Sequence, residues 1–231
     1  SRGASGDLAT GLALGLPALG LLVACVPRLL PAGTLRLARG LPTAVVLRGV
    51  ISGGFFGAET FLPLMLVERR DLATTWAGAS LTGAALTWSL GSWIQGRPGL
   101  RTPRWVLVTV GFVLVVVGVG FAAVATSPAV PAATAAVGWA VAGLGMGLGM
   151  TSLSVVVLET SPPHEQGVNS SALQVSDALG SIVLIGIAGV IYAALSTPDA
   201  PSALPFLVID LVMAVVLAAG AVVGHRLRDT R

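Results

Sequence analysis

The sequence carries very little charge. Only 10% of its 231 residues are charged, 13 basic and 10 acidic, while 55% are hydrophobic and the mean hydropathy is +0.91. Soluble domains carry about 25% charged residues, so these side chains are too few to cover a soluble surface. The composition excludes a soluble globular domain, a disordered chain and a coiled coil. It predicts a protein that crosses the bilayer several times.

Cysteine and histidine are almost absent. The single Cys25 excludes an intrachain disulfide, and one cysteine with two distant histidines, His164 and His225, cannot supply three zinc ligands. Both histidines are predicted to lie at the opposite membrane face from Ser80, whose Gly-x-Ser context superficially matches intramembrane serine proteases. No GxGD motif is present. We therefore expect no enzyme, no metal and no cofactor.

Lysine is absent. All 13 basic residues are arginine, and they occur in short clusters between apolar runs rather than along one polar face. This placement is typical of topology signals and argues against nucleic acid as a partner, despite a pI of 10.4. The exclusive use of arginine favours a bacterial origin.

Long apolar runs follow one another along the chain, and a helix needs about 20 such residues to cross a bilayer. The runs are continuous rather than alternating, which favours helices over the strands of a β-barrel. The sequence therefore predicts an all-α integral membrane protein with about seven transmembrane helices: 8–26, 43–67, 75–96, 105–126, 132–158, 167–195 and 204–224.

Arginine clusters mark one end of the predicted helices. By the positive-inside rule, the segments 27–42, 97–104 and 225–231 face the cytoplasm. Loop 159–166 must then be cytoplasmic too, although it contains two glutamates and no arginine. This topology predicts a multi-pass protein of the cell (inner) membrane with a cytoplasmic C-terminus. Because this topology places the N-terminus outside the cell, directly before a hydrophobic helix, we expect the chain to be part of a longer protein.

The last six spans form two triplets, 43–126 and 132–224, that enter the membrane from opposite sides. This number and orientation of spans are those of an inverted 3+3 repeat, which is common in transporters. The predicted organisation is a last helix of an N-terminal bundle at 1–26, a cytoplasmic linker at 27–42, a C-terminal six-helix bundle at 43–224 and a tail at 225–231.

Three stretches carry a family resemblance: LRGVISGGFFGAETFLPLMLVERRDLATTWAGASLTGAALTWSLGSWIQGR at 47–97, GSWIQGRPGLRTPR at 91–104 and SVVVLETSPPHEQGVNSSALQVSDALGSIVLIGIAGVI at 154–191. They resemble the C-terminal half of a major facilitator superfamily transporter and are similar to bacterial drug:proton antiporters. The resemblance implies proton-coupled export of a small-molecule drug or metabolite across the lipid bilayer by alternating access. It also implies that the partner of this bundle is a missing N-terminal half of the same transporter.

The family's cytoplasmic loop motif has the form G-x-x-x-D-R-x-G-R-[RK]. A degenerate copy is formed by Gly91, Arg97, Gly99, Arg101 and Arg104, without the acidic residue. The alternative interpretation is that these arginines only anchor the inner face. A non-transporting membrane scaffold or assembly subunit is the alternative function.

Four ionisable residues lie within the predicted spans, where each charge costs about 2.5–3.5 kcal/mol on insertion scales. Arg48 is either a snorkelling anchor near the cytoplasmic end or a functional residue. Glu59 follows three glycines that permit a helix break. Such a carboxyl can serve as the coupling site for a proton or as a site for a cationic substrate. The alternative is a structural carboxyl near the outer interface.

Asp177 belongs to a polar stripe on one helix face, together with Ser170, Gln174 and Ser181. The stripe indicates either a face that lines a central cavity or interhelical hydrogen bonds that fix the packing. In the first case Asp177 is a second candidate, after Glu59, to bind the driving proton. Asp210 is expected to be structural or interfacial. The run GLGMGLG at 143–149 contains two GxxxG pairs that favour close helix packing, with a flexible, methionine-flanked cavity wall as the alternative.

Overall fold

The computed structural model describes residues 29–196 and 202–228, and within them every regular element is helical. This confirms the predicted all-helical membrane fold. The predicted span 8–26, the segment 1–26, Cys25 and residues 229–231 lie outside the described residues. The elements are η1 (Thr34–Arg36), α2 (Leu41–Glu59), α3 (Leu62–Arg70), α4 (Thr74–Gln95), α5 (Arg104–Ala125), α6 (Ala133–Thr160), α7 (Gln166–Leu195), α8 (Leu204–Val223) and η2 (Gly224–Leu227).

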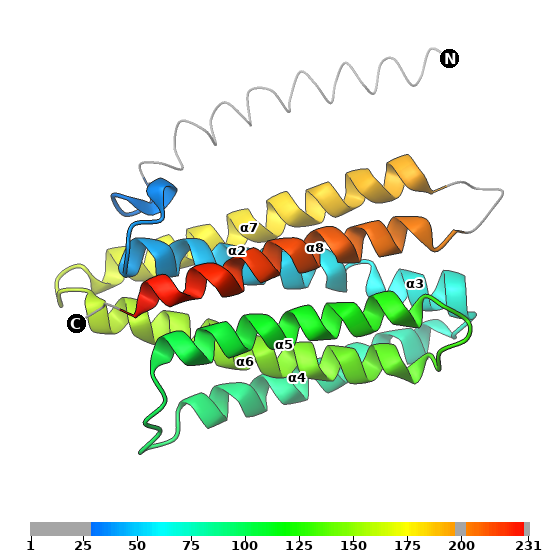
Figure 1. The fold of residues 1–231 in the computed structure, drawn as a ribbon, viewed down its shortest axis with the longest axis horizontal. Helices are drawn as coiled ribbons and strands as arrows, with labels where there is room; N and C mark the ends of the chain where they lie inside the picture. The colour runs from blue at the N-terminus through cyan, green and yellow to red at the C-terminus, as the bar shows by residue number, and fades with distance from the viewer. Residues whose placement is uncertain (1–28, 197–201, 229–231) are drawn as a thin grey trace, which may run out of the picture.

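Five described segments are long and apolar enough to cross a membrane: Leu41–Arg70, Arg104–Ala125, Ala133–Thr160, Gln166–Leu195 and Leu204–Leu227. Their ends agree with the predicted spans to within about three residues. The predicted span 75–96 forms α4 but is not among these five, because threonine, serine and glycine dilute its apolar residues. It nevertheless lies alongside α6 (Figure 1).

The predicted span 43–67 is divided into α2 and α3. The helix ends at Glu59 and restarts at Leu62. Pro63 explains the break, because proline has no N–H to donate to the carbonyl of residue 59 and its ring crowds that turn. A break near Glu59 was predicted, but from the glycines before it, which all stay within α2. The break therefore follows the carboxyl directly.

The helices pack in a pattern that repeats when the two triplets are exchanged. The exchange pairs α2 with α6, α4 with α7 and α5 with α8. α2 packs on α7, and correspondingly α6 packs on α4. Likewise, α5 packs on α6 and α8 packs on α2. Figure 1 shows α2, α7 and α8 grouped on one side of the bundle and α4, α5 and α6 on the other. This exchange of partners is what an inverted repeat produces.

The GLGMGLG run sits at the centre of this packing. A Cβ at Gly143 or Gly147 would come within 2.2 Å of α4 carbonyl oxygens, and one at Gly145 within 2.5 Å of an α5 carbonyl. The two GxxxG pairs thus face two different helices, since an offset of two residues is about 200° around a helix. The flanking methionines, Met146 and Met150, are buried. The run is a packing element, as the first interpretation predicted.

Glycines on α2 also allow close packing against neighbouring helices. Gly49 and Gly53 face α7, where a Cβ would meet backbone oxygens of Ser176 and Gly180 at 2.5 and 2.3 Å. Gly54 and the nearby Gly57 instead face leucine and methionine side chains of α8. The two triplets therefore share a packing function for glycine, although their sequences show no clear identity.

The loops predicted to be cytoplasmic lie together at one end of the bundle. Figure 1 shows η1, η2 and the loops after α4 and α6 at this end, with α3 and the loop after α5 at the other. The Arg226 guanidinium donates to the Leu37 carbonyl at 3.0 Å, which joins the end of α8 to the segment before α2. The described arginines of the segments 27–42, 97–104 and 225–228 thus lie at one end of the bundle, which we call the arginine-rich end.

Candidate functional site

An ion pair lies between two spans, far from each other in sequence. Nε and Nη2 of Arg48, on α2, each lie 3.1 Å from Oδ2 of Asp177, on α7. The two side chains are only 11% and 19% exposed. A snorkelling anchor would extend outward to the membrane surface. The Arg48 guanidinium instead points inward, to the carboxylate.

Neighbouring polar groups complete the network around this pair. Arg48 Nη1 donates to the Met150 carbonyl of α6 at 2.9 Å and to Ser154 Oγ at 3.0 Å. Ser52 Oγ donates to Asp177 Oδ1 and lies 2.9 Å from Ser181 Oγ. The cluster therefore connects α2, α6 and α7 through charges that compensate each other, as buried charges require.

The polar stripe of α7 is split by this arrangement. Asp177 and Ser181 face α2 and join the cluster, whereas Ser170 is half-buried and Gln174 is exposed. Neither of the latter two makes a side-chain hydrogen bond within the described residues. One part of the stripe thus fixes the packing of two helices, and Gln174 is exposed.

The second carboxyl site is built around Glu59, at the last position of α2. Its Oε1 accepts a hydrogen bond from the indole Nε1 of Trp139 on α6 at 3.2 Å. Trp139 stacks on Phe55 with ring centroids 5.3 Å apart. Phe56 and Trp88 of α4 extend this group with centroids 6.3 Å apart and are only half-buried. A carboxyl beside accessible aromatic faces suits a lipophilic or cationic small molecule.

The two sites are separate. Arg48 and Glu59 are eleven residues apart on one helix, which corresponds to about 16 Å at 1.5 Å per residue. The ion pair lies nearer the arginine-rich end, and Glu59 lies nearer the opposite end, beside the α2–α3 break. A proton or small molecule bound at Glu59 therefore does not contact the Asp177 carboxyl directly.

The residues of the loop motif lie at the end of α4 and the start of α5. Gly91 packs against α6, and Gly99 has a φ of +88°, which favours glycine. The Arg97 guanidinium lies 3.6 Å from the ring centroid of Trp93, and Arg104 donates to the Gln95 carbonyl at 3.3 Å. Within the described residues, no carboxylate pairs with these two arginines or with Arg101. The contacts fit an anchored turn without a charge relay.

Asp210 on α8 is buried, at 7% exposure, among apolar side chains. It borders a small cavity with Ala58, Phe61 and Leu62, next to the α2–α3 break. No hydrogen bond to it is found within the described residues. This position is compatible with the structural interpretation, and it places Asp210 on the α8 side of the break that follows Glu59.

Three contributing residues were missed from the sequence. Ser52 is four residues after Arg48 and so shares its helix face, a signal that was available. Trp139 lies four residues before the glycine run and Ser154 follows it by five, and no spacing links either residue to a charged partner. In residues 29–196 and 202–228, no three histidine, cysteine, aspartate or glutamate side chains gather as metal ligands do.

The chain is similar to a known protein family over most of its length. Residues 15–185, more than half of it, match the family model described as the Major Facilitator Superfamily. A comparison with curated proteins finds no match. The helical bundle, its five membrane-crossing segments and its compensated charges fit that family of multi-pass transporters. The chain therefore belongs to the Major Facilitator Superfamily and is a membrane transporter protein.

Proposed function

We propose that residues 43–224 are the C-terminal six-helix bundle of a proton-driven exporter of small molecules. Transport would proceed by alternating access, with this bundle rocking against an N-terminal bundle of the same transporter. The protein would lie in the cell membrane of a bacterium with its arginine-rich end, C-terminus included, in the cytoplasm. The observation that carries this proposal is the Glu59 carboxyl beside half-buried aromatic rings at a helix break.

In this proposal Glu59 binds the driving proton. A protonated Glu59 is neutral, keeps its contact with the Trp139 indole, and leaves the aromatic faces of Phe56 and Trp88 without a charged neighbour. Loss of the proton creates a carboxylate that attracts a lipophilic cation to those faces. Proton and substrate therefore compete for one group, which is the requirement for antiport.

The Arg48–Asp177 pair has a different part in this proposal. It holds α2 against α7 and α6 while remaining electrically neutral inside the bundle. Because Asp177 is paired with Arg48, we assign the driving proton to Glu59 rather than to Asp177. Gln174, exposed on the same helix, would contact substrate from the α7 side of the cavity.

Transport in membrane vesicles tests this function. Vesicles containing the full-length transporter are energised with a pH gradient, and movement of tetraphenylphosphonium, a lipophilic cation, is followed with and without that gradient. Glu59→Gln should abolish the gradient-driven component while leaving the amount of protein in the membrane unchanged. The control is Glu159→Gln, which removes the same charge from an exposed position at the end of α6.

Gradient-driven transport that persists in Glu59→Gln would remove Glu59 from the coupling mechanism. If neither the parent protein nor any variant moves a panel of lipophilic cations and neutral dyes, a membrane scaffold becomes the better explanation. Trp139→Phe offers a milder test, because it keeps the ring and removes the donor to Glu59. It should shift the pH dependence of transport without abolishing transport.

A further inference from the structure

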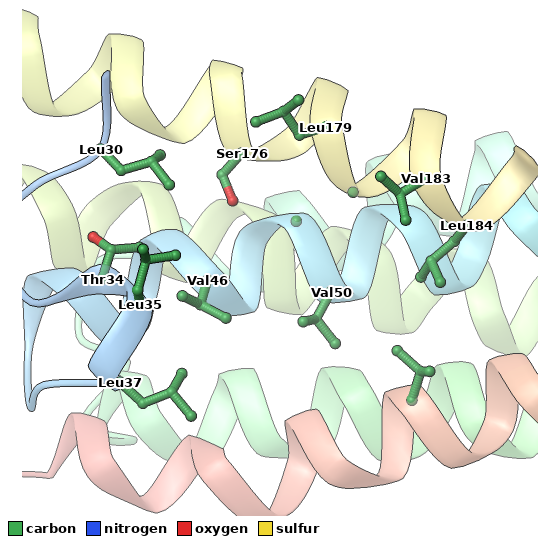
Figure 2. Close-up of a pocket in the computed structure, with 13 residues that line it drawn as sticks. Leu30, Thr34, Leu35, Leu37, Val46, Val50, Ser176, Leu179, Val183 and Leu184 are labelled. Atoms are coloured by element: carbon green, nitrogen blue, oxygen red, sulfur yellow. The ribbon is translucent and has the colours of Figure 1, made fainter. Parts of the chain in front are cut away.

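An apolar groove that contains none of the charged residues of the two sites lies along α2 and α7. It has a volume of about 630 Å³ and is enclosed by α2, α7, α8 and the segment that contains η1. This is within the ~300–1,000 Å³ of typical small-molecule sites. Figure 2 shows leucine and valine side chains along its length, contributed by the η1 segment at one end and by two helices beyond it: Leu30, Leu35, Leu37, Val46, Val50, Leu179, Val183 and Leu184.

The depth of the groove matches one leaflet of a membrane. Along α7 it is lined from Ser176 to Leu184, a rise of about 12 Å at 1.5 Å per residue. Half of a ~30 Å hydrocarbon core is about 15 Å. The groove begins at the arginine-rich end of the bundle and runs toward the middle of the predicted spans.

The mouth of the groove is positively charged. A second pocket of about 240 Å³, lined by residues 30–36, shares Leu30, Thr34 and Leu35 with the groove. Arg36 is exposed in this pocket, and no carboxylate is paired with it within the described residues. The Arg226 guanidinium is bonded to the carbonyl of Leu37, another groove residue. Among the residues that the structure describes, no acidic side chain lines either cavity.

Within the described lining of the groove, no free hydroxyl donor faces an incoming chain. The two lining hydroxyls are already used, because Ser176 Oγ donates to the Val45 carbonyl at 2.6 Å and Thr34 Oγ1 to the Pro31 carbonyl at 2.6 Å. An extended peptide would leave its backbone groups unsatisfied here. A hydrocarbon chain has no such requirement.

We propose that this groove and its mouth bind one anionic phospholipid. An acyl chain occupies the apolar groove, and the phosphate lies at Arg36, at the level of the membrane surface. The groove alone would accept any lipid tail, whereas the unpaired cation at its mouth selects a headgroup with net negative charge. This site is independent of the transport mechanism proposed above.

Native mass spectrometry of the full chain in detergent tests the headgroup. Phosphatidylglycerol should bind more tightly than phosphatidylcholine with the same acyl chains. Arg36→Gln should lower the affinity for phosphatidylglycerol about fivefold, which corresponds to ~1 kcal/mol per basic residue near anionic lipid. Arg101→Gln, an exposed arginine at the same end but outside the groove, should change it less than about twofold. Equal effects of the two substitutions would overturn the assignment of the headgroup site.

The tail site is tested by filling the groove. Val183→Trp should abolish the binding of both lipids, whereas Ile182→Trp, on the adjacent exposed position that does not line the groove, should retain it. Circular dichroism shows whether each variant folds. A photo-crosslinker at Val183 gives an independent result in the otherwise unchanged chain. Attachment to phospholipid supports the proposal, and attachment to residues 1–28 or to a second copy of the chain overturns it.

Discussion

Removing both partners of the Arg48–Asp177 pair should destabilise the fold by less than the sum of the two single removals. Asp177→Ala takes away the acceptor of the Arg48 Nε contact at 3.1 Å and leaves a guanidinium whose side chain is only 11% exposed. An uncompensated buried charge costs about 3–5 kcal/mol. Arg48→Met should have a similar effect, because it leaves the carboxylate with Ser52 and without its cation.

The double variant separates the pair from its surroundings. Arg48→Met with Asp177→Ala removes both charges, so its loss of unfolding free energy should fall short of the sum of the singles by about 1–3 kcal/mol. The assay is denaturant unfolding of the purified full chain in detergent micelles, followed by tryptophan fluorescence. The control is the exposed pair of His164 and Glu165 at 3.7 Å, where Glu165→Ala should change stability by less than about 1 kcal/mol. Single losses that add to within ~0.5 kcal/mol in the double variant would refute the reasoning.

Two further predictions concern packing and the loop opposite the arginine-rich end. Gly180→Ala should destabilise the protein by about 1–3 kcal/mol, because its Cβ would lie 2.0 Å from an α2 carbonyl oxygen. Gly186→Ala has open space around the new methyl group and should leave the thermal unfolding temperature unchanged or raised. Arg70→Gln should speed hydrogen exchange in residues 126–131, because the guanidinium donates to three carbonyls at the end of α5 and in the following loop. Exchange there as slow as in Arg101→Gln would contradict a clamping role for Arg70.

Composition and apolar run length were sufficient to predict the helices. A membrane-crossing helix requires length and hydrophobicity, which are local properties, so the predicted spans that fall within the described residues end within a few residues of the observed helical segments. The division of span 43–67 was predictable from Pro63, which the glycine-based argument overlooked. The contrast shows that proline at the start of a turn is a stronger break signal than nearby glycine, which here serves close packing instead.

The site was only partly accessible from sequence. The cost of a charge in a membrane singles out Arg48, Glu59 and Asp177. No local spacing, however, reveals that Arg48 and Asp177, 129 residues apart, form one ion pair. Pairing depends on which helices are neighbours and on their rotation about their axes. The same limit explains why the Trp139 donor to Glu59 had no predicted role, since it comes from a helix 80 residues away.

Proton release on substrate binding tests the central claim most directly. Tetraphenylphosphonium is added to the purified full-length transporter in weakly buffered solution, and the change in pH is followed with an indicator dye. If Glu59 exchanges its proton for a cation, the parent protein and Glu159→Gln should release protons in proportion to bound cation, and Glu59→Gln should release none. Undiminished proton release by Glu59→Gln would contradict the account.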